Sequence, residues 1–168
     1  MSEWETDKRW ADRFMPEVKS ILGRHLICEA PPSEDRERNT DLIVLKLDSV
    51  RIACRIRRFQ YELNYWRQFT IRTSRPSGQT TELYKMVSGF GDYLFYGFSN
   101  QAETGLSRWF IGDLFVFRGW FNAHLVNHNG DIPGISKPNP DGSSEFRAFE
   151  LSYIPDAFVI ARSDGAWK

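Results

Sequence analysis

Arginines are concentrated between positions 51 and 75 of this chain. That segment holds seven arginines and a single acid, Glu62, so its formal charge is +6, while the whole 168-residue chain has a net charge of zero. Guanidinium groups hold phosphates through paired hydrogen bonds, and aromatic rings stack on unpaired bases. Such rings are interleaved with the arginines, at Phe59, Tyr61, Tyr65, Trp66 and Phe69. The segment therefore predicts a local nucleic-acid-binding surface.

The residues expected at this surface share a positive charge and lie within or just after the segment. They are Arg51, Arg55, Arg58, Arg67, Arg72, Arg75 and Lys85. The alternative interpretation places the arginines on the solvated face of a half-buried sheet, with the aromatic residues packed on its other face. The sequence leaves both interpretations open.

Two apolar, strand-like runs meet at the start of the arginine segment. Residues 41–47 begin with Asp41, residues 50–57 end in Arg55-Ile56-Arg57, and only Asp48-Ser49 separates the two runs. So short a connection predicts an antiparallel hairpin, which brings Asp41 close to the two arginines. We therefore expect an ion pair between Asp41 and one of these arginines.

The same stretch carries a family resemblance. Thr40-Asp41 is followed by four apolar residues, and Val50 to Cys54 leads into Arg55-Ile56-Arg57. This pattern resembles the motif of the PD-(D/E)XK nuclease superfamily, above all the archaeal-type Holliday junction resolvases. In those proteins one strand opens with Pro-Asp and the next ends Glu-apolar-Lys. The resemblance covers roughly residues 10 to 98 and implies a restriction-endonuclease-like core. The chain is also similar to short proteins of tailed phages or prophages, which implies a role in phage DNA metabolism.

The resemblance implies phosphodiester hydrolysis with Mg²⁺ or Mn²⁺. The metal would make a bound water acidic and would be held by hard carboxylate oxygens. Asp41 and Glu17 match the metal ligands of the family, Arg57 stands in place of the lysine, and Glu82 is a further candidate catalytic residue.

Arg55 departs from the family motif because it occupies the position of the second acid. A guanidinium cannot ligate a cation and repels one. Glu37, Glu82 or Asp92 would have to supply the missing ligand; otherwise the Asp41–arginine ion pair would occupy the place of the metal. The alternative function is a catalytically inactive structural or protein-interaction module, such as an inhibitor or assembly protein. Its partner would be a second copy of the chain or a host protein.

His124 and His128, followed by Asp131, are a second set of metal-ligand types. Segment 114–125 is strongly aromatic and predicts one or two strands, on which residues four apart have Cβ atoms about 13 Å apart. One metal could join the two histidines only if the chain turned or formed a helix there. We therefore expect loop histidines, and we expect the aromatic run from Trp109 to Phe121 to be core or an oligomer contact.

Hydrophobic periodicity predicts the remaining elements. A helix is expected over about 6–26 with a kink or break at Pro16, and a helix over about 82–87 with Thr80 or Thr81 as its cap. Strands are expected at 26–30, 68–73 and 93–98, a helix at 102–114, a long polar loop at 127–145, and closing elements at 146–154 and 157–163.

These elements predict an α/β (α+β) fold with a mixed central sheet flanked by helices. We expect one domain over residues 1–168, with a core at about 6–98 and an aromatic-rich C-terminal extension at 99–168. The chain has no apolar run long enough for a membrane span, and its charged N-terminus lacks an apolar signal core, so a cytoplasmic protein is expected. The expected partner is nucleic acid, DNA in particular, with no membrane partner.

Overall fold

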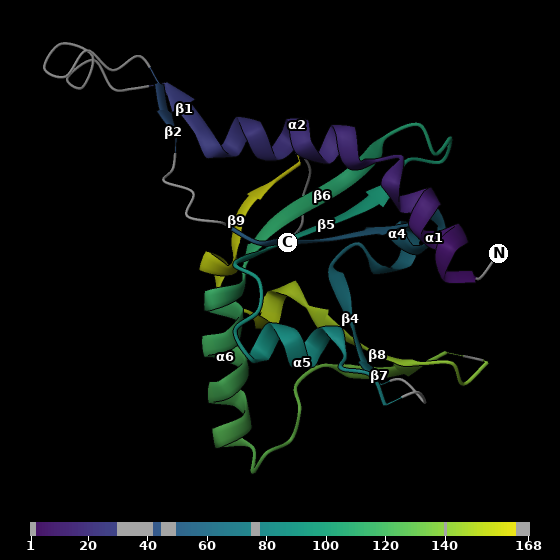
Figure 1. The fold of residues 1–168 in the computed structure, drawn as a ribbon. Helices are drawn as coiled ribbons and strands as arrows, with labels where there is room; N and C mark the ends of the chain where they lie inside the picture. The colour runs from purple at the N-terminus through teal and green to yellow at the C-terminus, as the bar shows by residue number, and fades with distance from the viewer. Residues whose placement is uncertain (1–2, 30–41, 45–49, 75–77, 140, 164–168) are drawn as a thin grey trace, which may run out of the picture. The chain divides into compact units, whose positions relative to one another are not determined.

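A computed structural model describes residues 3–29, 42–44, 50–74, 78–139 and 141–163. The chain divides into two compact units, Met1–Val50 and Arg51–Lys168. Figure 1 shows their elements. Within the described residues no helix has the length and apolar character needed to cross a membrane.

The first unit contains two helices and a two-stranded sheet. Helix α1 spans Glu3–Asp12 and α2 spans Met15–Leu26. The break between them lies just before Pro16, which then occupies the first turn of α2, where its missing N–H costs no hydrogen bond. The predicted break at this proline is confirmed. Strand β1 (Ile27–Glu29), as predicted within 26–30, pairs antiparallel with β2 (Leu42–Val44).

The second unit is built on a mixed four-stranded sheet and a three-stranded antiparallel sheet. The first sheet has the order β3-β5-β6-β9, made of Ile52–Arg57, Tyr93–Ser99, Leu106–Asp113 and Val159–Arg162. Only β3 and β5 are parallel. The second sheet has the order β4-β8-β7, made of Gln68–Ser74, Glu145–Glu150 and Ile135–Pro138. The α+β class with a mixed sheet and flanking helices is therefore as predicted.

Three α-helices and two short 3₁₀ turns connect these strands. They are α4 (Phe59–Tyr65), α5 (Glu82–Val87), α6 (Leu114–Asn127), η1 (Leu151–Tyr153) and η2 (Asp156–Phe158). Thr81 caps α5, since its hydroxyl accepts a hydrogen bond from the backbone N–H of Tyr84. Asp113 caps α6 by accepting from the N–H groups of Phe115 and Val116 at 2.7 and 3.3 Å. Helices α5 and α6 pack on each other beside the sheets (Figure 1).

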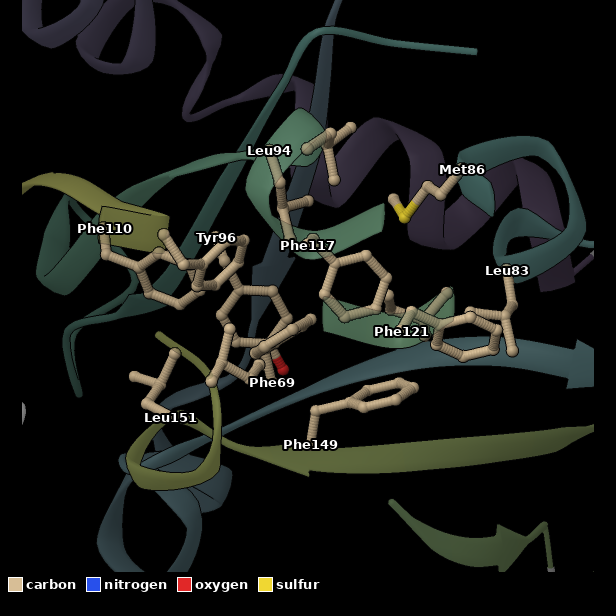
Figure 2. Close-up of a cluster of buried hydrophobic side chains, with 14 of the residues drawn as sticks. Phe69, Leu83, Met86, Leu94, Tyr96, Phe110, Phe117, Phe121, Phe149 and Leu151 are labelled. Atoms are coloured by element: carbon tan, nitrogen blue, oxygen red, sulfur yellow. The ribbon is translucent and has the colours of Figure 1, made fainter. Parts of the chain in front are cut away.

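An aromatic core fills the space between the two sheets and the helices (Figure 2). Phe69 of β4 is fully buried at its centre, with ring centroids of five other aromatic residues between 5.3 and 6.1 Å away. These are Tyr96, Phe110, Phe117, Phe149 and Phe158. Four of the five lie beyond residue 98, so the segment predicted as an extension supplies much of the core.

Several local predictions are wrong. Segment 102–114, predicted as a helix, contains strand β6, and segment 114–125, predicted as strands, forms α6. The buried residues Leu114, Phe117 and Phe121 do have helical spacing. The sequence did not reveal this period because other aromatic residues of the segment lie between them. The predicted hairpin of 41–47 with 50–57 is also wrong. Among the described residues β2 pairs with β1, and β3 pairs in parallel with β5.

Candidate nucleic-acid interface

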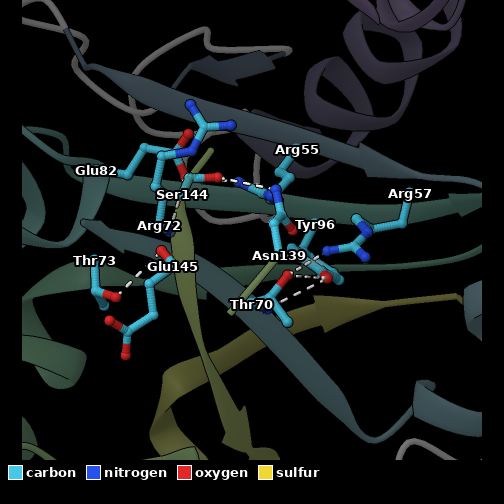
Figure 3. A network of polar contacts seen from close by, with 10 residues as sticks. All are labelled: Arg55, Arg57, Thr70, Arg72, Thr73, Glu82, Tyr96, Asn139, Ser144 and Glu145. Atoms are coloured by element: carbon cyan, nitrogen blue, oxygen red, sulfur yellow. Dashed lines mark hydrogen bonds and ion pairs between the residues drawn. The ribbon is translucent and has the colours of Figure 1, made fainter. Parts of the chain in front are cut away.

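Arg55 and Arg57 lie on the edge strand β3, on the face of the sheet that packs on the aromatic core. Their backbone partners across the parallel pair are Tyr96 and Phe98 of β5, both of which belong to that core. Ile56, between the two arginines, faces the other side of the sheet and is buried. The two guanidinium groups therefore extend from the edge of one sheet toward the other sheet, where Figure 3 shows them.

Arg55 is held by an ion pair and an aromatic contact. Its Nη1 lies 2.6 Å from Oε2 of Glu82, in the first turn of α5, and its guanidinium carbon is 4.9 Å from the ring centre of Phe146. Arg72 of β4 lies over the same ring, at 5.1 Å, and its backbone N–H donates to the same carboxylate oxygen at 3.4 Å. Nε of Arg55 is buried without a hydrogen-bond partner among the described residues. Arg55 and Glu82 thus connect β3, β4, β8 and α5.

Arg57 is held by neutral groups. Its Nη1 donates to the hydroxyl of Thr70 at 2.5 Å, and that hydroxyl lies 3.3 Å from the phenol oxygen of Tyr96. The guanidinium lies 4.2 Å from the ring centre of Tyr61 on α4. In the described part of the chain Arg57 has no carboxylate partner, so its charge is not compensated by an adjacent acid.

Helix α4 presents further rings, each with a cation beside it. Tyr61 and Tyr65 lie one turn apart on the same face and are 38% and 44% exposed. The ammonium of Lys137 is 6.0 Å from the ring centre of Tyr65, and the guanidinium of Arg67 is 4.6 Å from that of Trp66. We call the set Arg57, Tyr61, Tyr65, Trp66, Arg67 and Lys137 the α4 surface.

A buried acid fixes the inner side of α4. Glu62, only 9% exposed, receives a hydrogen bond from Nε of Arg108 at 2.8 Å and another from the hydroxyl of Ser107. The backbone N–H of Phe59 donates to the hydroxyl of Ser99 at 3.1 Å. The acid of the arginine segment is therefore turned inward and paired, and the cations beside the rings of α4 come from neighbouring segments.

The other predicted nucleic-acid contacts are dispersed over the second unit. Arg51 is exposed, and its backbone N–H donates to Asp92 at 2.8 Å. Arg58 pairs with Glu103 at 3.0 Å. Lys85 is exposed and lines a shallow hollow with Gly78, Gln79, Thr80 and Glu82. Arg75 lies outside the described residues.

The predicted metal ligands are not brought together in the described part of the chain. Asp41 and Glu37 lie outside it, so the predicted Asp41–arginine ion pair lies outside it as well; Glu17 is on α2 of the first unit. No three His, Cys, Asp or Glu side chains among the described residues are placed to hold a metal ion. Glu82 bonds to Arg55, and a cation bound there would face the guanidinium. The described residues therefore do not fit a Mg²⁺ or Mn²⁺ centre.

Of the α4 surface, the sequence predicted Arg67 as a nucleic-acid contact, the rings beside it as stacking partners and Arg57 as a catalytic residue; it predicted neither Lys137 nor the helix itself. Lys137 lies far along the chain in β7, within the segment predicted as a loop, and no local signal connects it to Tyr65. Glu82 was proposed as a catalytic acid, whereas its described partner is Arg55. Comparisons with protein-family models, with curated proteins and with solved structures found no match to this chain.

Proposed function

We propose that the second unit binds single-stranded nucleic acid on the α4 surface. The observation that carries the proposal is the pairing of exposed or half-buried rings with cations. Arg57 lies beside Tyr61, Lys137 beside Tyr65, and Arg67 beside Trp66. Proteins that hold single strands combine such rings, which stack on bases, with cations that follow the phosphates.

The charge of this surface supports the proposal although the whole chain is neutral. Arg57, Arg67 and Lys137 have no carboxylate within salt-bridge distance among the described residues. Arg108, by contrast, is already paired with the buried Glu62. Within the described ranges these three cations thus face no competing acid, and a phosphate would satisfy guanidinium donors that now face neutral groups or solvent.

The exposed rings favour unpaired bases over a duplex. In a duplex the bases are stacked on each other, so Tyr61 and Tyr65 could meet a base face only where the strand is open. Stacking does not depend on the sugar, and the resemblance to DNA-processing nucleases makes DNA the first substrate to test. The proposal predicts similar binding of pyrimidine DNA and RNA single strands, and weaker binding of a duplex of the same length.

Fluorescence anisotropy with a labelled oligothymidylate of about 16 nucleotides, near the upper end of usual site sizes, tests the proposal. Tyr61→Ala should weaken binding by about 5- to 150-fold, since stacking of one base contributes about 1–3 kcal/mol. Arg57→Gln should lower the slope of log K against log salt by about 0.7, the value for one phosphate of a single strand.

The matched controls are Tyr153→Ala and Arg162→Gln. Tyr153 is more exposed than Tyr61, and Arg162 lies on β9, at the other edge of the sheet from β3. Both variants should bind like the unaltered protein. Absence of binding to single-stranded DNA and RNA at low salt, or equal losses in the controls, would refute the proposal and favour the structural or protein-interaction module.

Metal-dependent hydrolysis stays a prediction of the nuclease resemblance. The same oligonucleotide, incubated with Mg²⁺ or Mn²⁺ and with a chelator, tests it beside Asp41→Ala. Cleavage that needs the metal and the aspartate would support a nuclease. Cleavage that persists with the chelator and in the variant would exclude this mechanism.

A further inference from the structure

Two histidines at the end of α6 lie side by side in the second unit. His124 is in the last turn of the helix and His128 is its C-cap residue. Their imidazole rings are nearly parallel, with an interplanar angle of 8° and centroids 3.9 Å apart. The helix produces this contact, because residues four apart share one face, whereas on a strand they would be about 13 Å apart.

The hydrogen bonding of His128 leaves one nitrogen available. Its Nδ1 lies 3.0 Å from the backbone carbonyl oxygen of His124. In the tautomer whose Nδ1–H donates to that oxygen, Nε2 carries a free lone pair. Metal-binding histidines commonly have this arrangement, since a carbonyl that accepts from one ring nitrogen orients the other toward the metal. His128 is also exposed, so its ring is accessible to ions in solvent.

The geometry points to a site for a borderline divalent transition metal, and we propose that His124 and His128 bind Zn²⁺ or Ni²⁺. Two nitrogens bound to one zinc at 2.0–2.1 Å lie about 3.3 Å apart. The two rings now lie in nearly parallel planes, so both side chains must turn before their in-plane lone pairs meet at one ion. The C-terminal end of a helix carries partial negative charge and favours a cation. Imidazole suits these metals, whereas Mg²⁺ prefers oxygen ligands.

The site would have two protein ligands. In the described part of the chain no third His, Cys, Asp or Glu joins the pair, so water or groups of another molecule would fill the remaining positions. The spacing equals that of helical zinc proteases, but the residue before His128 is Asn127, and the general-base glutamate of their His-Glu-x-x-His pattern is replaced by Leu125. The proposal is therefore a binding site and not a protease centre.

Isothermal titration of the full chain with Zn²⁺, Ni²⁺ and Mg²⁺ tests the site. The chain has three histidines, so His25→Gln is a matched control for His124→Gln and His128→Gln. Cys28→Ser and Cys54→Ser control for its two cysteines, of which Cys54 is a free, exposed thiol. Removing even a hydrogen-bond partner of a metal-bound histidine typically costs about tenfold or more in affinity. Loss of either imidazole of the pair should therefore weaken Zn²⁺ binding at least that much, while the control variants bind as before.

Thermal unfolding with and without Zn²⁺ gives a second measurement that does not depend on the heat of binding. Zn²⁺ should raise the Tm of the unaltered chain and of His25→Gln, since a ligand that binds the folded state stabilises it. It should leave the Tm of His128→Gln unchanged, and acidification should weaken the effect because ligating imidazoles must be neutral. The proposal is overturned by Zn²⁺ binding that survives His128→Gln, or by the absence of both heat and Tm shift with Zn²⁺ and Ni²⁺.

Discussion

If the second unit binds nucleic acid as proposed, replacing Glu82 with glutamine should strengthen that binding. The substitution keeps the shape of the side chain and removes the charge that Arg55 now faces at 2.6 Å. The amide oxygen of the new side chain can still accept the weak hydrogen bond from the backbone N–H of Arg72, so α5 and β4 stay connected. The main change is a guanidinium that no longer has an acid as its partner.

The magnitudes follow from the exposure of the pair. The side chain of Arg55 is 20% exposed and that of Glu82 is 39% exposed, so solvent screens their attraction and the pair contributes about 0.5–1 kcal/mol to folding. Glu82→Gln should therefore cost little stability. If the freed Arg55 neutralises one more phosphate, the slope of log K against log salt becomes steeper by about 0.7, or about fivefold in affinity for each tenfold change in salt.

Anisotropy titrations with single-stranded oligothymidylate between about 50 and 200 mM salt measure both quantities. Asp131→Asn, an exposed loop position, is the control for loss of one negative charge. The prediction assumes that Glu82 competes with phosphate for Arg55. An unchanged or weaker affinity with an unchanged salt slope would refute this assumption. The nuclease interpretation predicts a different outcome, because a catalytic Glu82 would be needed for metal-dependent cleavage whatever its effect on binding.

Three further substitutions test the packing that positions the surface, each by chemical denaturation. Glu62→Gln should destabilise the fold by about 1–2 kcal/mol, because Arg108 loses its charged partner, although solvent reaches part of that guanidinium; an unchanged midpoint would contradict the anchoring of α4. Gly112→Ala should lower the free energy of unfolding by about 1–3 kcal/mol, since an added Cβ would lie 2.5 Å from the ring of Phe158. Stability equal to that of the unaltered protein would show that the ring can move away. Gly119→Ala, on the exposed side of α6 with no atom near an added Cβ, should instead stabilise the fold by about 0.5–1 kcal/mol; a loss would contradict the helical assignment.

Elements with strong local signals were predictable from the sequence. Strands β4 and β5 follow alternating or continuous apolar runs bounded by turn residues, and α5 begins directly after Thr81, a residue whose side chain can cap a helix. Pro16 likewise directly follows the break between α1 and α2 and lies in the first turn of α2. In each case residues within one turn or one strand determine the outcome, so no distant contact is needed to predict it.

The exchanged assignments of β6 and α6 show where local reasoning fails. Their sequences form one aromatic run, and Asp113 between them is the residue that ends the strand and caps the helix. An aspartate at a helix start is a recognisable signal, but it was hidden because apolar residues continue on both sides of it. The error also concealed the His124–His128 contact, which exists only if the segment is helical.

Pairing between distant strands could not be predicted from adjacent residues. The short connection before β3 favours a hairpin, yet β3 pairs in parallel with β5, about forty residues further along the chain. The β3–β5 pairing places Arg55 opposite Tyr96, and α5, between those strands in sequence, brings Glu82 to the same edge. The observed ion pair of Arg55 thus depends on a crossover connection that the local sequence does not specify.

The arginines at the end of β3 have different surroundings, which explains why a partly buried strand can end with them. Arg55 pairs with Glu82 and lies on Phe146, so its burial is compensated by charge and by an aromatic face. Arg57 contacts a hydroxyl and the ring of Tyr61, which are both neutral, and no acid among the described residues pairs with it. The Arg55–Glu82 ion pair is sufficient to link the neighbouring strands and helix. In the part of the chain that the structure describes, no acid compensates the charge of Arg57, which lies next to the partly exposed ring of Tyr61. A purely structural link between strands does not explain this charge, whereas a bound phosphate would.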